Sequence, residues 1–275
     1  MNRLTQERRT QILGLLVEGV SLRAASRLSG ASINTVTKLL VDVGSACQAY
    51  HDEHVRNLNC QRVQCDEIWS FVYAKQKNVP KHLWGVPGVG DIWTWVALDA
   101  DSKLAVSWLV GGRDAEYANT FMGDVADRLA NRVQLTTDGH IAYLEAVEGA
   151  FGADVDYAQL VKLYGSPPPE EEKRYSPACC VGAKKDRIEG RPVKRHISTS
   201  YIERQNLTMR MHMRRFTRLT NTFSKKVENH AHAVAIHFVY YNFVRIHTTL
   251  RVTPAMAAGV SDRLWELSEI AELAA

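Results

Sequence analysis

Three acidic residues in unlike settings constrain this chain more than any other feature. Asp66 lies in the alternating, aromatic-rich stretch 63–72, which is typical of a β-strand. Asp138 ends a short apolar stretch that runs into a glycine turn, and Glu203 lies near the start of a basic segment predicted to be helical. Two carboxylates at strand ends and one on a helix can converge although long stretches separate them. Converging carboxylates repel one another unless a hard divalent cation lies between them, so the pattern predicts a metal.

Composition places the chain among ordinary globular proteins, with 275 residues, 45% hydrophobic and 23% charged. No apolar run approaches the roughly 20 residues of a membrane-spanning helix, and no apolar signal core follows the N-terminal charges. We therefore expect a cytoplasmic protein without a membrane partner. The net charge is only +4, but Lys and Arg are dense in 184–195 and 204–226, which favours an anionic polymer as partner. A solvated helix face is the alternative.

The five cysteines do not predict a disulfide framework, because their number is odd and no secretion signal accompanies them. Cys47, Cys60 and Cys65 lie near histidines, which raises the question of zinc. Paired ligand spacings are absent, so we interpret these cysteines as buried free thiols. Cys179 and Cys180 receive no role.

Residues 5–43 predict three short helices. Ser21 is expected to cap the second helix, Gly30 to end it, and Ser32 to cap the third. This spacing matches a helix-turn-helix, although a three-helix packing unit that binds nothing is the alternative. The third helix carries polar residues suited to base edges and phosphates in a major groove, namely Ser32, Asn34, Thr35, Thr37 and Lys38.

The remaining chain predicts a meander of three strands, then a helix, a strand ending at Asp138, a helix and a short fifth strand around 154–157. This order is that of a ribonuclease H-like α/β fold, a mixed sheet flanked by helices. Long helices are expected over 198–220 and 225–245, and a helical tail follows. The predicted divisions are a helix-turn-helix domain (1–45), a helical linker (46–61), a ribonuclease H-like domain (62–254) with a mobile loop (163–196), and the tail (255–275).

Glu67 competes with Asp66 for a place in the acidic set. Successive side chains of a strand point to opposite faces, so we expect only one of the two to enter the site. Asp66 is favoured because the alternation places Ile68 on its face and Glu67 with the bulky Trp69.

The sequence resembles transposases of the insertion-sequence-one family, within the superfamily named for two aspartates and one glutamate. The residues that carry the resemblance are Cys65 to Phe71, Thr137-Asp138-Gly139, Tyr201 to Arg210, Arg214 to Thr220, Phe223 to Lys226 and Tyr240 to Phe243. The resemblance implies metal-dependent nicking and joining of transposon ends. It assigns catalysis and metal binding to Asp66, Asp138 and Glu203, with Mg²⁺ as cofactor and Mn²⁺ able to substitute.

The resemblance also implies that Arg210, nearly two helical turns after Glu203, contacts DNA. The wider set of arginines expected to hold DNA phosphates comprises Arg204, Arg210, Arg214, Arg215 and Arg218. Zinc-finger cysteines, which some relatives carry ahead of the helix-turn-helix, are missing here.

The sequence thus predicts a DNA transposase that binds double-stranded DNA, both transposon ends and target. It is expected to act as a homo-oligomer, at least a dimer on paired ends. Two alternatives stay open: a ribonuclease H-like nuclease that cuts without joining, and a helix-turn-helix regulator with a decayed catalytic domain.

Overall fold

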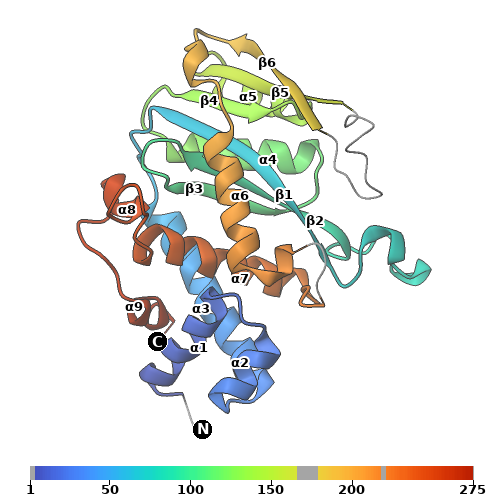
Figure 1. The fold of residues 1–275 in the computed structure, drawn as a ribbon, viewed down its shortest axis with the longest axis vertical. Helices are drawn as coiled ribbons and strands as arrows, with labels where there is room; N and C mark the ends of the chain where they lie inside the picture. The colour runs from blue at the N-terminus through green and yellow to red at the C-terminus, as the bar shows by residue number, and fades with distance from the viewer. Residues whose placement is uncertain (1–3, 166–178, 218–220, 275) are drawn as a thin grey trace.

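A six-stranded mixed sheet with the order β3-β2-β1-β4-β5-β6 forms the centre of the protein (Figure 1). The computed structural model describes residues 4–165, 179–217 and 221–274. The strands are β1 (Arg62–Val72), β2 (Gly90–Asp99), β3 (Ala105–Gly111), β4 (Gln134–Asp138), β5 (Asp156–Gly165) and β6 (Cys179–Glu189).

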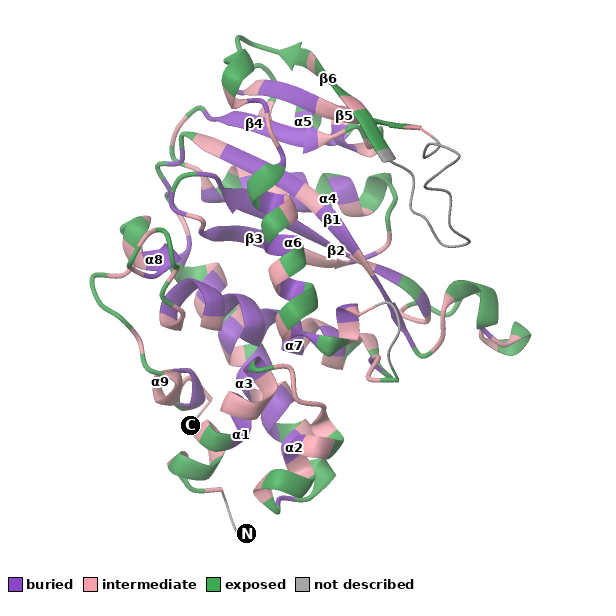
Figure 2. Cartoon of the chain, in the orientation of Figure 1, coloured by how far each residue is buried: buried purple, intermediate pink, exposed green. Residues whose placement is uncertain are grey.

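Strand pairing puts β1 in the middle of the sheet. β1 pairs antiparallel with β2 and parallel with β4, β4 pairs parallel with β5, and β6 returns antiparallel along β5. A meander followed by two parallel strands is consistent with the predicted ribonuclease H-like fold. Side chains of β1 to β4 are largely buried, whereas β6 is largely exposed (Figure 2).

Helices cover both faces of this sheet. They are α1 (Gln6–Val17), α2 (Leu22–Ser29), α3 (Ile33–His54), α4 (Ala115–Arg128), α5 (Ala142–Phe151), α6 (Ser200–His212), α7 (Val227–Val239), α8 (Pro254–Ala257) and α9 (Leu267–Glu272). A π-helical turn, Tyr240–Val244, extends α7. Helix α6 crosses one face of the sheet, and α4 and α5 lie on the other (Figure 1). Among the described residues, no helix has the length and apolarity to cross a membrane.

The three N-terminal helices begin where the sequence predicts, and α2 also ends there. The hydroxyl of Ser21 accepts a hydrogen bond from the amide of Ala24, and Ser32 does the same for Thr35. Such caps satisfy amides that have no partner inside the helix. Gly30 ends α2 with φ of +68°, a left-handed conformation that glycine adopts without a steric penalty.

Helix α3 differs from the predicted helix and linker, because it runs without a break for 22 residues. Its second half is a core element in which Val43, Cys47 and His51 are buried. The boundary expected at residue 45 therefore falls inside one helix, and no separate linker follows it. The sequence does not reveal that the helix continues, because a run of charged residues on its exposed face is also typical of a linker.

Close contact between α3 and α7 explains why residue 44 is glycine. A Cβ atom at Gly44 would lie only 2.7 Å from the backbone Cα of His232 on α7. The N-terminal unit is also attached through α1, where Gln6 donates to the backbone oxygen of Ser268 at 2.8 Å and Arg9 donates to that of Ala274 at 2.8 Å. The N-terminal helices and the sheet domain thus share one hydrophobic core.

The prediction of a loop over 163–196 was wrong for residues 163–165 and 179–189. Strand β5 continues to Gly165, and residues 179–189 return along it as β6. An exposed edge strand lacks the apolar alternation that marks a half-buried strand. The run of charged residues at 184–187 is equally typical of a loop, so the sequence did not indicate a strand here. Residues 166–178 lie outside the described residues.

Two helix boundaries also differ from the sequence prediction. Helix α6 ends at His212 rather than near residue 220, because Met213 has extended backbone angles and a short 3₁₀ turn, Arg214–Phe216, follows. The tail forms two short helices, α8 and α9, instead of one. Arg218 lies outside the described residues.

Replacing Gly44 with alanine is expected to destabilise the protein by about 1–3 kcal/mol, because the added methyl group meets the α7 backbone. Gly149 on α5 is the matched control, since a Cβ there has no neighbour within 4 Å. Gly149→Ala is expected to stabilise by about 0.5–1 kcal/mol through helix propensity. Urea denaturation measures both, and equal effects of the two substitutions would contradict the close packing of α3 on α7.

Candidate active site

One glutamine side chain holds the start of α6 against the central strand. The Oε1 atom of Gln64, a buried residue of β1, accepts hydrogen bonds from the amides of Tyr201 and Ile202 at 2.9 and 3.1 Å. These amides belong to the first turn of α6, where no partner inside the helix is available. The bond pair therefore fixes the first turn of α6, and with it Glu203, beside β1.

A second contact from α6 reaches Asp66 itself. The Nδ2 atom of Asn206 donates to Oδ2 of Asp66 at 2.9 Å. Asn206 follows Glu203 by three positions, so the two side chains share one face of the helix. The face of α6 that carries Glu203 therefore looks onto the carboxylate of Asp66.

Asp138 enters the same region from the end of β4, which lies parallel beside β1. Its Oδ1 accepts a hydrogen bond from the amide of His140 at 3.0 Å, a turn that the following Gly139 accommodates. An open cleft of about 420 Å³ lies between these elements. The cleft is lined by Asp66, Arg113, Asp138, Gly139, His140, Leu160, Val161, Lys162, Tyr164, Thr199 and Glu203.

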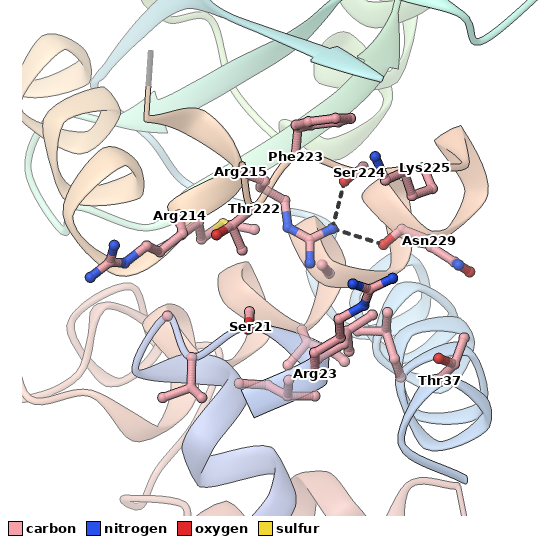
Figure 3. A pocket seen from close by; sticks show the side chains of 18 of the residues that line it. Ser21, Arg23, Thr37, Arg214, Arg215, Thr222, Phe223, Ser224, Lys225 and Asn229 are labelled. Atoms are coloured by element: carbon pink, nitrogen blue, oxygen red, sulfur yellow. Dashed lines mark hydrogen bonds between the residues drawn. The ribbon is translucent and has the colours of Figure 1, made fainter. Parts of the chain in front are cut away.

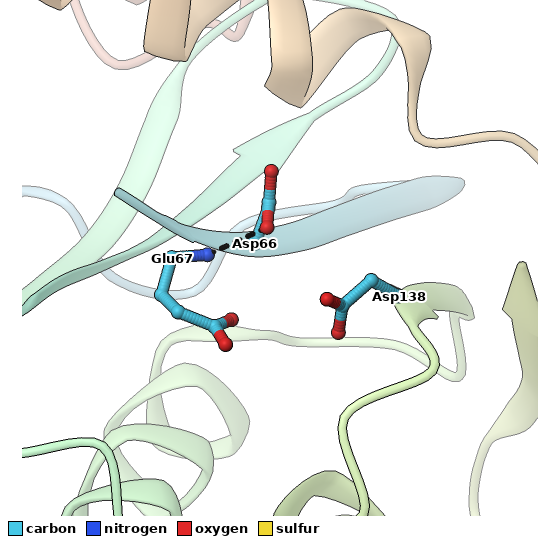
Figure 4. A group of neighbouring side chains, drawn as sticks. All are labelled: Asp66, Glu67 and Asp138. Carbon is cyan, nitrogen blue, oxygen red and sulfur yellow. Dashed lines mark hydrogen bonds between the residues drawn. The ribbon is translucent and has the colours of Figure 1, made fainter. Parts of the chain in front are cut away.

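The carboxylate of Glu67 lies closer to those of Asp66 and Asp138 than the alternation of side chains along β1 led us to expect. Asp66 points toward α6 and Glu67 toward the opposite face, as alternation requires, yet the longer side chain of Glu67 extends toward Asp138 (Figure 4). One carboxylate oxygen from each of Asp66, Glu67 and Asp138 lies within 4.8 Å of the other two. Alternation along the strand therefore does not prevent the carboxylate of Glu67 from lying near those of Asp66 and Asp138.

Glu67 nevertheless has its own protein partners. Its carboxylate is almost fully buried, accepts from Arg113 Nε at 2.6 Å and accepts from the hydroxyl of Tyr143 at 3.0 Å. Glu67 does not line the open cleft, whereas Asp66 does. Asp66 is thus the neighbour that faces the accessible space.

Crowding of the carboxylates changes their proton affinity. Burial raises the pKa of Asp66, and together with the charges of Glu67 and Asp138 it brings that pKa to about 7. Burial also raises the pKa of Glu67, and Asp138 adds to this, while Arg113 opposes it. The site therefore holds negative charge at an energetic cost that a bound cation would relieve.

The acidic set fits a hard divalent metal. Two oxygens that share one Mg²⁺ lie at most about 4 Å apart, because each is about 2.0–2.1 Å from the ion. The 4.8 Å spacing of Asp66, Glu67 and Asp138 comes close to this limit, and all the donors are carboxylate oxygens.

Lys162 is the cleft residue that the sequence prediction missed. Its ammonium group lies 2.5 Å from Oε2 of Glu203, and the hydroxyl of Thr199 donates to Oε1 at 2.5 Å. Burial lowers the pKa of Lys162, but the bond to Glu203 outweighs it and the net pKa is raised. Strand pairing could have located Lys162 near the site. Leu160 of β5 pairs with Asp138, and Lys162 follows Leu160 by two residues, so both lie on the same face of the strand. Ending the fifth strand at residue 157 concealed it.

The residues at the start of α3 that the sequence predicts to contact DNA differ in their hydrogen bonding. Ser32 and Thr35 share a hydrogen bond of 2.9 Å, Thr37 donates to the backbone oxygen of Ile33, and Lys38 pairs with Asp42. Asn34 is exposed.

The arginines of α6 and the following turn also divide into two groups. Arg204, Arg210 and Arg214 are exposed. Arg215 turns inward, where its Nη1 atom donates to the hydroxyl of Ser224 at 2.9 Å and to the backbone oxygen of Asn229 at 3.1 Å. Arg215 therefore braces the chain between α6 and α7 instead of lying open to solvent.

Three cysteines are free and buried, as expected: Cys47, Cys60 and Cys65. Within the described part of the chain, the group of side chains able to hold a metal is the acidic one at Asp66, Glu67 and Asp138. The thiols take no part in it.

The fold and the cleft define a mixed α/β protein whose central sheet carries clustered carboxylates beside a helix that bears a further glutamate. Comparison with known families matches residues 183–244 to the IS1 transposase family. The match supports an IS1-family transposase and confirms the resemblance seen in the sequence. Glu203 lies inside the matched segment, and Asp66 and Asp138 lie outside it. No curated protein matches the chain.

Replacing Asp66 with asparagine is expected to stabilise the protein without metal, most strongly at pH 8. The raised pKa, about 7 against about 3.9 in an unfolded chain, means that wild type loses stability as pH rises through this interval. The gain is expected to be small at pH 4.5 and on the order of a few kcal/mol at pH 8.

Denaturation with EDTA at both pH values measures this gain, and Asp114→Asn is the control. Asp114 caps α4 and is not among the described residues that line the cleft, and asparagine caps equally well. Magnesium is expected to stabilise wild type more than Asp66→Asn. A gain that does not change with pH would contradict the crowding of charge at Asp66.

Proposed function

We propose that the protein is an Asp-Asp-Glu transposase that binds insertion-sequence ends and carries out metal-dependent strand cleavage and strand transfer. The observation that carries the proposal is the convergence of Asp66, Asp138 and Glu203 from β1, β4 and α6 onto one open cleft. The family match over the segment that contains Glu203 supports it.

The proposed chemistry is displacement at a DNA phosphodiester. Divalent metal ions, when bound, activate the attacking hydroxyl group and stabilise the departing oxygen. Asp66 and Asp138 would hold the metal as hard oxygen ligands, and Glu203 would complete the site from α6. Magnesium is the proposed ion, and manganese is expected to substitute.

Cations at the edge of the cleft would orient the phosphate. Lys162 and Arg113 both line the cleft, and each pairs with a glutamate, Glu203 and Glu67 respectively. With Glu203 serving as a metal ligand, the ammonium of Lys162 would be available to hold a phosphate oxygen. His140 lines the same cleft and offers a further hydrogen-bonding group.

Sequence recognition would come from the first three helices, with Ser32, Asn34, Thr35, Thr37 and Lys38 presented by the start of α3. The exposed arginines Arg204, Arg210 and Arg214 would hold phosphates regardless of sequence. We further propose action on paired ends as a homo-oligomer and a cytoplasmic location.

Replacing each acid of the proposed set with its amide, as Asp66→Asn, Asp138→Asn or Glu203→Gln, is expected to abolish strand cleavage and leave end binding largely intact. Neutral amides keep the size of the side chain but lose the anionic oxygen that a hard cation needs. Magnesium-dependent cutting and joining of labelled element ends measure this, with Asp114→Asn as the active control.

The variant Glu67→Gln distinguishes the role of Glu67 from that of its neighbour Asp66. It is expected to retain more cleavage activity than Asp66→Asn. Wild-type cutting by any one of the three amide variants would remove that residue from the set. Cutting without joining by the wild-type protein would favour the nuclease alternative.

Arg204→Ala is expected to weaken DNA binding equally for cognate and random duplexes and to reduce the salt slope of binding by about one unit. Arg204 is exposed on the same helix as Glu203, and a contact between its guanidinium and a DNA phosphate would release about one counterion from the DNA. Loss of this contact lowers the salt dependence of binding accordingly. Arg215→Ala is the matched control: its guanidinium is already hydrogen-bonded within the protein, so its loss is expected to lower folding stability instead. Affinity measured against salt, with a thermal melt of each variant, distinguishes them. An unchanged slope for Arg204→Ala would assign this arginine to a solvated face.

A further inference from the structure

A second cavity, of about 460 Å³, lies apart from the carboxylate cleft, between the N-terminal helices and the C-terminal segment (Figure 3). The turn from α1 to α2 and the first half of α3 form one side. Residues 213–215 and 221–225, together with helix α7, form the other. The chemistry of these walls identifies a class of ligand.

The charged groups of the cavity are all cationic. Four basic side chains line it, namely Arg23, Arg214, Arg215 and Lys225, and no Asp or Glu is among the described lining residues. Arg215 is fixed in position, since Figure 3 shows its guanidinium bonded to Ser224 and Asn229. Both acceptors are neutral oxygens, so they leave its positive charge unbalanced. An anion is the complementary ligand.

The remaining wall of the cavity is largely apolar. It includes Leu16, Val17, Leu40, Met213, Ala233 and Ile236. Phe223 also lines the cavity, and Lys225 places its ammonium 3.6 Å from the centre of that ring. A ligand that fits both walls has an apolar body and an anionic group.

His237 gives an independent indication that a ligand belongs here. It lines the cavity from α7, is only 4% exposed, and neither of its ring nitrogens has a hydrogen-bond partner among the residues that the structure describes. A buried imidazole left without partners costs about 1–3 kcal/mol for each unsatisfied group. A neutral ring offers one donor and one acceptor, the pair that a heterocyclic base edge can satisfy.

We propose that this cavity binds a nucleoside phosphate, supplied by one unpaired nucleotide of a bound DNA strand. The base occupies the apolar wall beside His237 and Phe223, and the phosphate lies against the cations at the rim. A volume of about 460 Å³ is within the range of small-ligand pockets. DNA is the favoured source because Thr37 of α3, a residue of the proposed reading helix, lines the same cavity. In this respect the proposal rests on the proposed function.

The test compares three DNA probes with the full-length protein in EDTA, so that no cleavage is involved. Fluorescence anisotropy measures binding of a duplex with one unpaired nucleotide, the same duplex fully paired, and a short single strand. The wild-type protein is expected to prefer the unpaired nucleotide over the fully paired duplex by about tenfold, as expected for one base stacked in an aromatic-lined site.

Two substitutions in the cavity are expected to remove this preference. His237→Phe and Arg23→Gln should each reduce it by about fivefold and leave binding of the paired duplex unchanged. Arg27→Gln is the matched control, because Arg27 is an exposed arginine of the same helix that does not line the cavity. His237→Phe should also raise the melting temperature of the free protein, since it removes two unsatisfied nitrogens. A purely structural histidine would show the rise in melting temperature without the loss of preference, which would overturn the proposal.

Competition separates the possible sources of the ligand. Displacement of the single strand by dAMP, together with a preference for the unpaired nucleotide, supports the proposal. Displacement by dAMP without that preference assigns the cavity to a free nucleotide and overturns the DNA source. Displacement by polyglutamate but not by dAMP assigns it to an acidic peptide and overturns the nucleotide. The preference needs no metal, so it can hold or fail independently of cleavage by Asp66, Asp138 and Glu203.

Discussion

The geometry of the cleft depends on the two hydrogen bonds that the side-chain oxygen of Gln64 accepts from the first turn of α6. Asp66 lies two residues after Gln64 on the same face of β1, so one strand positions a carboxylate and the helix that supplies another. Asn206 adds a second connection between the same two elements. Two residues far apart in sequence thus acquire a fixed separation through uncharged groups, which do not compete for the cation that the carboxylates attract.

The distribution of partners around the carboxylates explains how the protein keeps them together. Each glutamate has a protein cation beside it, Arg113 for Glu67 and Lys162 for Glu203. The hydrogen bonds to Asp66 and Asp138 come instead from neutral amides, those of Asn206 and Glu67 for Asp66 and that of His140 for Asp138. These neutral donors do not cancel the charge of an ionised aspartate, so Asp66 and Asp138 remain suited to binding an external cation.

Much of the fold follows from short-range patterns. The helix caps at Ser21, Ser32 and Asp114 and the strand that carries Asp66 obey local rules, and the structure confirms their places. The sequence prediction failed where tertiary contacts decide. The charged strand β6 is stabilised by pairing with β5, and the second half of α3 is buried against α7 through Gly44. Convergence of Asp66, Asp138 and Glu203 could be expected from element order. The place of Lys162 and the inward turn of Arg215 could not, because each depends on distant partners.

The unbroken course of α3 has a mechanical consequence. Its 22 residues, Ile33–His54, extend for about 33 Å, from the exposed start of the helix to the end where His51 is packed in the core beside β3. No break in the helix separates its two halves, and its buried residues belong to the same hydrophobic core as the sheet. The start of α3 is therefore held at a fixed distance from the sheet that carries the cleft, so a ligand bound by the first three helices is positioned relative to the carboxylates by the helix itself.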